Sequence, residues 1–124
     1  GSLEDCRKQV EKYSLGLLVQ TVGDVEDSMD FEGMMEAEER HKRQFTELAE
    51  VLRKEYPSLL PLGSGCCTIC SACAGPEGEC RFPDKRISSL EAFGIVVSDL
   101  CSRNHMKYYY GPQKIAYTSC YLLE

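Results

Sequence analysis

The chain has 124 residues, of which 43% are hydrophobic and 27% charged, a composition typical of a folded domain rather than a disordered segment. Its 14 basic and 20 acidic residues give a formal net charge of −6, which disfavours nucleic acid as a partner because phosphate binding needs a basic surface. No run approaches the roughly 20 apolar residues that a membrane span requires. We therefore expect a single cytoplasmic domain over residues 1–124, with no nucleic-acid or membrane partner.

The first half of the chain predicts a strand between two helices. Residues 3–12 have the mixed pattern of a short helix, and residues 14–22 form a mostly apolar, β-prone run that we interpret as a central strand. After an acidic loop over residues 23–30, residues recur at helical spacing, which predicts a long main helix that stops before Pro57. The stripe predicted to be buried is Met34, His41, Phe45, Leu48 and Leu52. Residues 59–62 predict a short strand.

The second half predicts another helix and then a hairpin. Residues 88–91 (Ser-Ser-Leu-Glu) fit a capping box, so we expect a helix over residues 88–103. Gly94 in its middle costs about 1 kcal/mol relative to alanine, which indicates close backbone packing. Turn-forming residues separate two β-prone runs, 107–110 and 115–123, and predict a hairpin. This order of elements predicts an α+β fold: a small, mostly antiparallel sheet with both main helices on one face.

Cysteine is the unusual residue of this chain. Five of its eight cysteines fall between Cys66 and Cys80. Sulfurs so close in sequence could close only short local disulfide loops, so their clustering favours a metal site. The segment 63–86 is rich in glycine, proline and cysteine, and we expect it to be an irregular metal loop. With the spacing C-x2-C-x2-C-x6-C, the predicted ligands are Cys67, Cys70, Cys73 and Cys80.

A [4Fe–4S] cluster is the preferred occupant, because bacterial ferredoxin loops also begin with C-x2-C-x2-C. The six residues before Cys80 differ from the ferredoxin spacing, so a four-cysteine zinc site is the alternative. Three basic residues follow the last ligand and either offset the charge of the thiolate centre or form a solvated turn. They are Arg81, Lys85 and Arg86.

The two metals predict different functions. A cluster predicts an electron-transfer or redox-accessory module that serves a redox partner protein, whereas zinc predicts a structural domain for protein interaction. A third interpretation is a thiol–disulfide oxidoreductase that uses one C-x2-C pair, which gives Cys80 no part. The sequence contains no convincing hydrolytic triad, phosphate loop or pair of catalytic carboxylates. We therefore assign no catalytic residue and favour a non-catalytic module.

Several other residues could bind metal but are better explained by packing. Cys66 adjoins the quartet and is interpreted as a spare or buried thiol, with a ligand role left open. Glu38 and His41 have the Glu-x-x-His spacing of di-iron bundles, but the sequence holds a single copy, so we expect His41 to be packed or hydrogen-bonded. The same packing role is expected for the cysteines in predicted regular structure, Cys6, Cys101 and Cys120.

Taken together, these motifs carry a family resemblance. They are the cysteine quartet followed by Arg-Phe-Pro, the segment 88–95 and the closing Tyr-Tyr-Gly-Pro at 109–112. The chain resembles an uncharacterised prokaryotic family of predicted metal-binding proteins over nearly its whole length. The resemblance implies metal binding through cysteines and no particular activity. Longer members carry a further cysteine-containing segment upstream, so it also implies that this chain is a piece of a longer protein.

Overall fold

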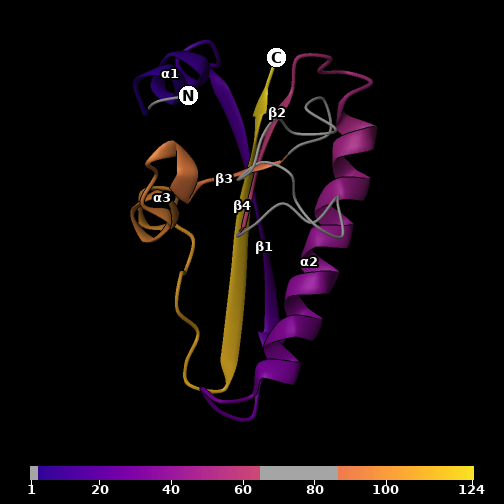
Figure 1. The fold of residues 1–124 in the computed structure, drawn as a ribbon, viewed down its shortest axis with the longest axis vertical. Helices are drawn as coiled ribbons and strands as arrows, with labels where there is room; N and C mark the ends of the chain where they lie inside the picture. The colour runs from indigo at the N-terminus through magenta and orange to yellow at the C-terminus, as the bar shows by residue number, and fades with distance from the viewer. Residues whose placement is uncertain (1–2, 65–86) are drawn as a thin grey trace, which may run out of the picture.

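The computed structural model describes residues 3–64 and 87–124, and its elements form an α+β fold (Figure 1). In these two ranges, no helix is long and apolar enough to cross a membrane. In chain order the elements are α1 (Leu3–Val10), β1 (Leu15–Asp24), α2 (Phe31–Leu52), β2 (Leu60–Gly63), β3 (Ser88–Ser89), the 3-10 turn η1 (Glu91–Phe93), α3 (Val97–Arg103) and β4 (Lys114–Leu123).

The four strands form one mixed sheet in the order β1-β4-β2-β3. β4 pairs antiparallel with β1 over ten residues, from Asp24 opposite Lys114 to Leu15 opposite Leu123, and antiparallel with β2. β2 and β3 are parallel. The mostly antiparallel sheet is confirmed, but the prediction of a central strand at residues 14–22 is wrong, because β1 lies at an edge of the described sheet. An apolar run does not distinguish an edge strand from an inner one when helices cover the sheet.

Helices cover both faces of the sheet rather than one (Figure 1). On one face, Phe45 and Ala49 of α2 pack against Tyr121 of β4, and on the other Cys101 of α3 packs near Cys120 of β4. The predicted placement of both main helices on one face is therefore wrong. The sheet needs helices on both faces because successive side chains of β4 point to opposite faces and are apolar on both.

The main helix forms where the periodicity predicts it. The Asp30 carboxylate accepts a hydrogen bond from the Gly33 amide at 2.9 Å and caps the first turn of α2. Its buried residues follow helical spacing and face the sheet: Ala37, His41, Phe45 and Ala49. Phe45 stacks on Tyr121 with ring centroids 4.2 Å apart. Leu48, predicted on the buried face, lies at its margin and is 37% exposed.

The predicted helix over residues 88–103 is interrupted. Ser89 accepts a hydrogen bond from the Ala92 amide at 3.0 Å and starts only the short turn η1, so the predicted capping box is wrong. Gly94 ends that turn with φ +75°, a left-handed conformation that favours glycine. A Cβ at Gly94 would lie 2.9 Å from Leu3 Cδ2, so the close packing predicted there is confirmed. Helix α3 begins only at Val97.

The predicted hairpin is also wrong, because residues 107–113 form an irregular connection. β4 already has β1 on one side and β2 on the other, so neither of its edges is left for residues 107–110. Side chains hold this connection instead. The Gln20 amide donates to the Lys107 carbonyl at 2.8 Å, and the Tyr110 hydroxyl donates to the Gln20 carbonyl oxygen.

Candidate metal centre

The predicted metal loop interrupts the sheet between β2 and β3. All of its predicted functional residues lie outside the described residues: the ligands Cys67, Cys70, Cys73 and Cys80, the neighbouring Cys66, and the basic residues Arg81, Lys85 and Arg86. The structure describes the residues on either side of this segment, and these define how its two ends are held.

The two ends of the loop meet in the sheet. Leu62 pairs with Ser88 and Gly63 pairs with Ser89 in parallel register. Neighbouring strands lie about 4.8 Å apart, so the chain leaves the sheet and returns to it at adjacent positions. The Leu90 amide also donates to the Gly63 carbonyl at 3.0 Å. We call these five residues, 62–63 and 88–90, the loop stem.

The loop stem is tightly packed. Leu62 and Leu90 are 0% and 1% exposed and belong to the cluster formed with α3. A Cβ on Gly63 would lie 2.9 Å from Ile87 Cγ2, so the closest packing at the stem depends on glycine. The sequence predicts the first strand of the stem, at residues 59–62, but not β3, because two serines carry no β-prone signal. A loop fixed at both ends has less conformational freedom to lose when its side chains bind a ligand.

The cysteines outside the loop have structural surroundings. Cys101 and Cys120 are buried in the same cluster as Leu62, and Cys6 is half-buried on α1. Burial raises the pKa of the Cys120 thiol to about 11, so it stays protonated at neutral pH and is a poor metal ligand. The predicted packing role of Cys101 and Cys120 is confirmed.

His41 lies in a buried polar cluster between α2 and the sheet. It is 3% exposed, and its Nδ1 and Nε2 atoms lie 2.8 Å from Thr21 Oγ1 and 2.6 Å from Ser119 Oγ. The rings of Phe45 and Tyr117 stack on it with centroid distances of 6.1 and 6.3 Å. Both ring nitrogens are therefore occupied by hydroxyl groups, and the predicted packed and hydrogen-bonded role is confirmed. Burial, and then the charge of Lys42, lower the pKa of His41.

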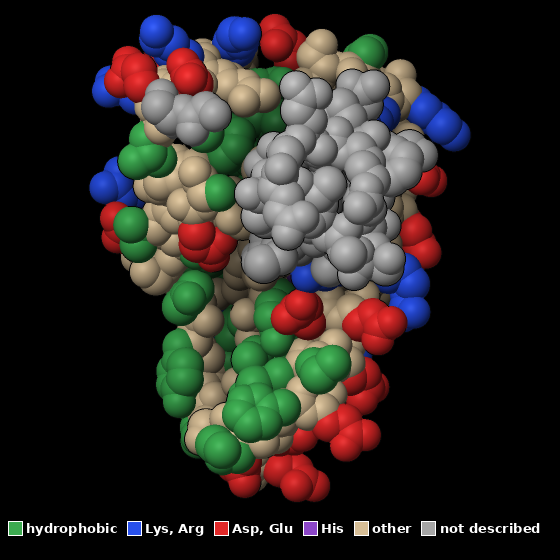
Figure 2. All heavy atoms as spheres, in the orientation of Figure 1, with side chains coloured by type: hydrophobic (Ala, Val, Ile, Leu, Met, Phe, Trp, Pro, Cys, Tyr) green, Lys and Arg blue, Asp and Glu red, His purple; other side chains and the backbone are tan. Residues whose placement is uncertain are grey.

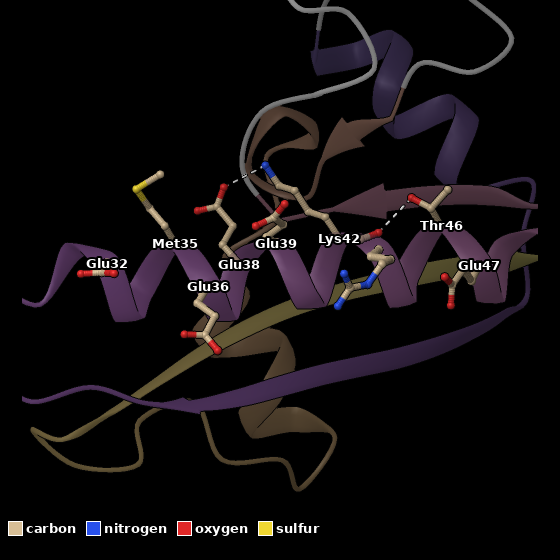
Figure 3. A pocket seen from close by; sticks show the side chains of 9 residues that line it. Glu32, Met35, Glu36, Glu38, Glu39, Lys42, Thr46 and Glu47 are labelled. Atoms are coloured by element: carbon tan, nitrogen blue, oxygen red, sulfur yellow. Dashed lines mark hydrogen bonds and ion pairs between the residues drawn. The ribbon is translucent and has the colours of Figure 1, made fainter.

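A surface hollow of about 1210 Å³ runs along the outer side of α2 (Figure 3). Two cationic side chains, Lys42 and Arg43, interrupt its acidic lining, and Lys42 forms an ion pair with Glu38 at 2.9 Å. In the described ranges, no three His, Cys, Asp or Glu side chains are grouped so that they could hold a metal ion. The acidic residues of this hollow are spread along the helix: Glu32, Glu36, Glu38, Glu39 and Glu47.

The end of the molecule where α2 begins is apolar on the face shown in Figure 2, with acidic side chains around it. The loops before α2 and β4 lie there and are joined by a hydrogen bond from the Val25 amide to the Gln113 carbonyl at 3.0 Å. Exposed hydrophobic side chains in and beside these loops include Met29, Phe31 and Tyr109. This end offers apolar contact surface rather than metal ligands.

Comparison with known proteins identifies a family. Residues 1–123 match the family described as "Predicted metal-binding protein (DUF2284)". No curated protein and no solved structure matches the chain. Because the family match spans nearly the whole chain, the resemblance seen in the sequence is confirmed, and the protein belongs to this family of predicted metal-binding proteins of unknown function.

Proposed function

We propose that Cys67, Cys70, Cys73 and Cys80 hold a [4Fe–4S] cluster and that the protein is an electron-transfer or redox-accessory module for a redox partner protein. Membership of a predicted metal-binding family supports the metal. The C-x2-C-x2-C spacing supports the choice of cluster over zinc. When bound, such a cluster accepts and releases single electrons.

The observation that carries this proposal is the loop stem. The parallel pairing of Leu62 with Ser88 holds both ends of the cysteine segment at one place in the sheet. The packing of Leu62 and Leu90 against α3 fixes that place. A cage of four thiolates needs its ligands to converge from different parts of one loop, and a closed base favours such convergence. The parts of the chain that the structure describes offer no competing group of ligands.

Anaerobic purification with iron, sulfide and zinc analysis tests the proposal. The reconstituted protein is expected to be brown, with broad visible absorbance that bleaches on addition of dithionite, and to contain about four iron and four sulfide per chain. A colourless protein with one zinc per chain would overturn the proposal in favour of a structural four-cysteine site.

Cysteine variants identify the ligands. Cys80→Ser is expected to lose iron and visible absorbance, whereas the matched control Cys6→Ser is expected to keep both, because Cys6 lies on α1 outside the loop. Cys66→Ser should also keep the cluster if Cys67 is the ligand. A Cys80→Ser protein that binds no metal yet reduces disulfides as fast as the parent would favour the C-x2-C oxidoreductase.

A further inference from the structure

The outer edge of β1 has an unusual composition for an edge strand. Its pairing with β4 is unbroken over ten residues, so this edge contains no bulge. From Leu15 to Gly23 it contains no charged residue and no proline. Natural proteins commonly protect exposed edges with lysine, proline or a bulge, because unpaired backbone groups there can bind another strand. Within its apolar stretch β1 has none of these three protections, although its Val22 carbonyl does accept a hydrogen bond from the Arg40 guanidinium of α2 at 3.3 Å.

Apolar side chains are exposed along this edge strand. Leu15 is 54% exposed, Leu17 37% and Val22 39%. Their exposure leaves apolar surface at both ends of β1, while its middle residues are half-buried against the helices. An edge with these properties is suited to the addition of another strand.

The charges at the two ends of β1 indicate what kind of strand can pair with its outer edge. Lys12 is exposed just before β1, and Asp24 and Glu26 are exposed at its other end. Asp24 already forms an ion pair with Lys114, and its side chain is still 84% exposed. If two copies of β1 pair antiparallel, Lys12 of each copy approaches the acidic end of the other. Parallel pairing would instead bring like charges together, so the charge pattern favours the antiparallel arrangement.

We propose that β1 pairs antiparallel with β1 of a second copy of this chain, which joins the two four-stranded sheets into one continuous sheet. The contact uses the same surface on both copies, so a twofold axis closes it and limits assembly to a dimer. The proposal does not depend on the metal or on the redox role.

Sedimentation velocity over about 1 to 100 μM protein, under anaerobic conditions, tests the dimer. The parent protein is expected to sediment as a dimer, and Leu17→Lys as a monomer, because a lysine at an edge opposes strand addition. The matched control is Val51→Lys, which places the same charge at a 60% exposed position on α2, and it should remain dimeric. A monomeric parent at about 100 μM, or a Leu17→Lys protein that dimerises as tightly as the parent, would overturn the proposal.

Exchange of the charges that flank β1 tests the antiparallel orientation and uses more than one variant. Lys12→Glu should weaken the dimer about tenfold, because both ends of the contact change from attraction to repulsion. The double variant Lys12→Glu, Glu26→Lys should restore the parent affinity. Circular dichroism and melting temperature must match the parent for each variant, which separates dissociation from misfolding. A weakened dimer that the second substitution fails to restore would exclude the antiparallel pairing.

Discussion

Replacement of His41 by alanine is expected to lower the free energy of unfolding by about 3 kcal/mol at pH 7.5. The imidazole is buried between Phe45 and Tyr117, so its removal leaves a cavity that costs about 2 kcal/mol in lost packing. The same change leaves the fully buried Ser119 hydroxyl without its partner, which costs about 1 kcal/mol or more. Thr21 is only half-buried and can bind water instead.

The pH dependence of the free energy of unfolding gives a second test of the role of His41. Burial lowers the pKa of His41 below its ordinary value of 6.5, so the unfolded chain binds this proton more readily than the folded protein. The stability contributed by neutral His41 is therefore fully present above about pH 6.5. It is lost as the pH falls below that value, by at most about 1.4 kcal/mol per pH unit. In His41→Ala this part of the slope should vanish.

Urea unfolding from pH 8 to about pH 5.5, a range above most carboxylate titrations, measures both effects. His105→Asn is the matched control, because His105 is exposed with φ +58° and asparagine tolerates that left-handed conformation. It should change stability by less than about 0.5 kcal/mol and keep the parent slope. A loss below about 1 kcal/mol in His41→Ala, or an unchanged slope in that variant, would refute the reasoning.

Two further predictions concern glycines. Gly63→Ala should cost about 1 to 3 kcal/mol in urea unfolding and reduce the metal retained after purification, because its Cβ would meet the branched Ile87 side chain at 2.9 Å. Gly16→Ala is its control: its Cβ would have ordinary contacts of 3.5 Å or more, so a comparable loss there would contradict the argument. Gly94→Ala should cost about 1 to 2 kcal/mol because alanine is strained at φ +75°. Hydrogen exchange should then be faster in α1, where Leu3 contacts Gly94, and unchanged exchange there would contradict the contact.

The elements with strong periodicity could be predicted from the sequence. The helical spacing of the stripe from Met34 to Leu52 places α2 correctly, although only His41 and Phe45 of that stripe are buried, together with Ala37 and Ala49 beside it. The break at Gly94 could not be predicted, because a single left-handed residue leaves the apolar spacing around it unchanged. The position of β1 at an edge depends on which strands pair with β4, and strand order is a long-range property that local pattern does not encode.

The candidate site also has one part that could be predicted from the sequence and another part that could not. The cysteine spacing predicts four ligands from one short segment, because metal coordination imposes local spacing. The loop stem depends on a parallel pairing of only two residues on each strand, Leu62 with Ser88 and Gly63 with Ser89, which is too short to produce a periodic signal. The hydrogen-bond partners of His41 could not be predicted either, because Thr21 and Ser119 come from opposite ends of the sequence.

The inner position of β4 has a consequence for the order in which the protein folds. β4 follows every other described element in the chain, yet both β1 and β2 depend on it for their antiparallel hydrogen bonds. Pairing over such sequence separations slows folding, and sheets of this kind commonly form in milliseconds to seconds rather than microseconds. On the ribosome, β1 and β2 emerge as unpaired apolar strands and wait for residues 114–123, a period in which aggregation competes with folding. The cysteine segment is also synthesised before β4 holds β2 in place, so metal loading is expected to follow completion of the sheet.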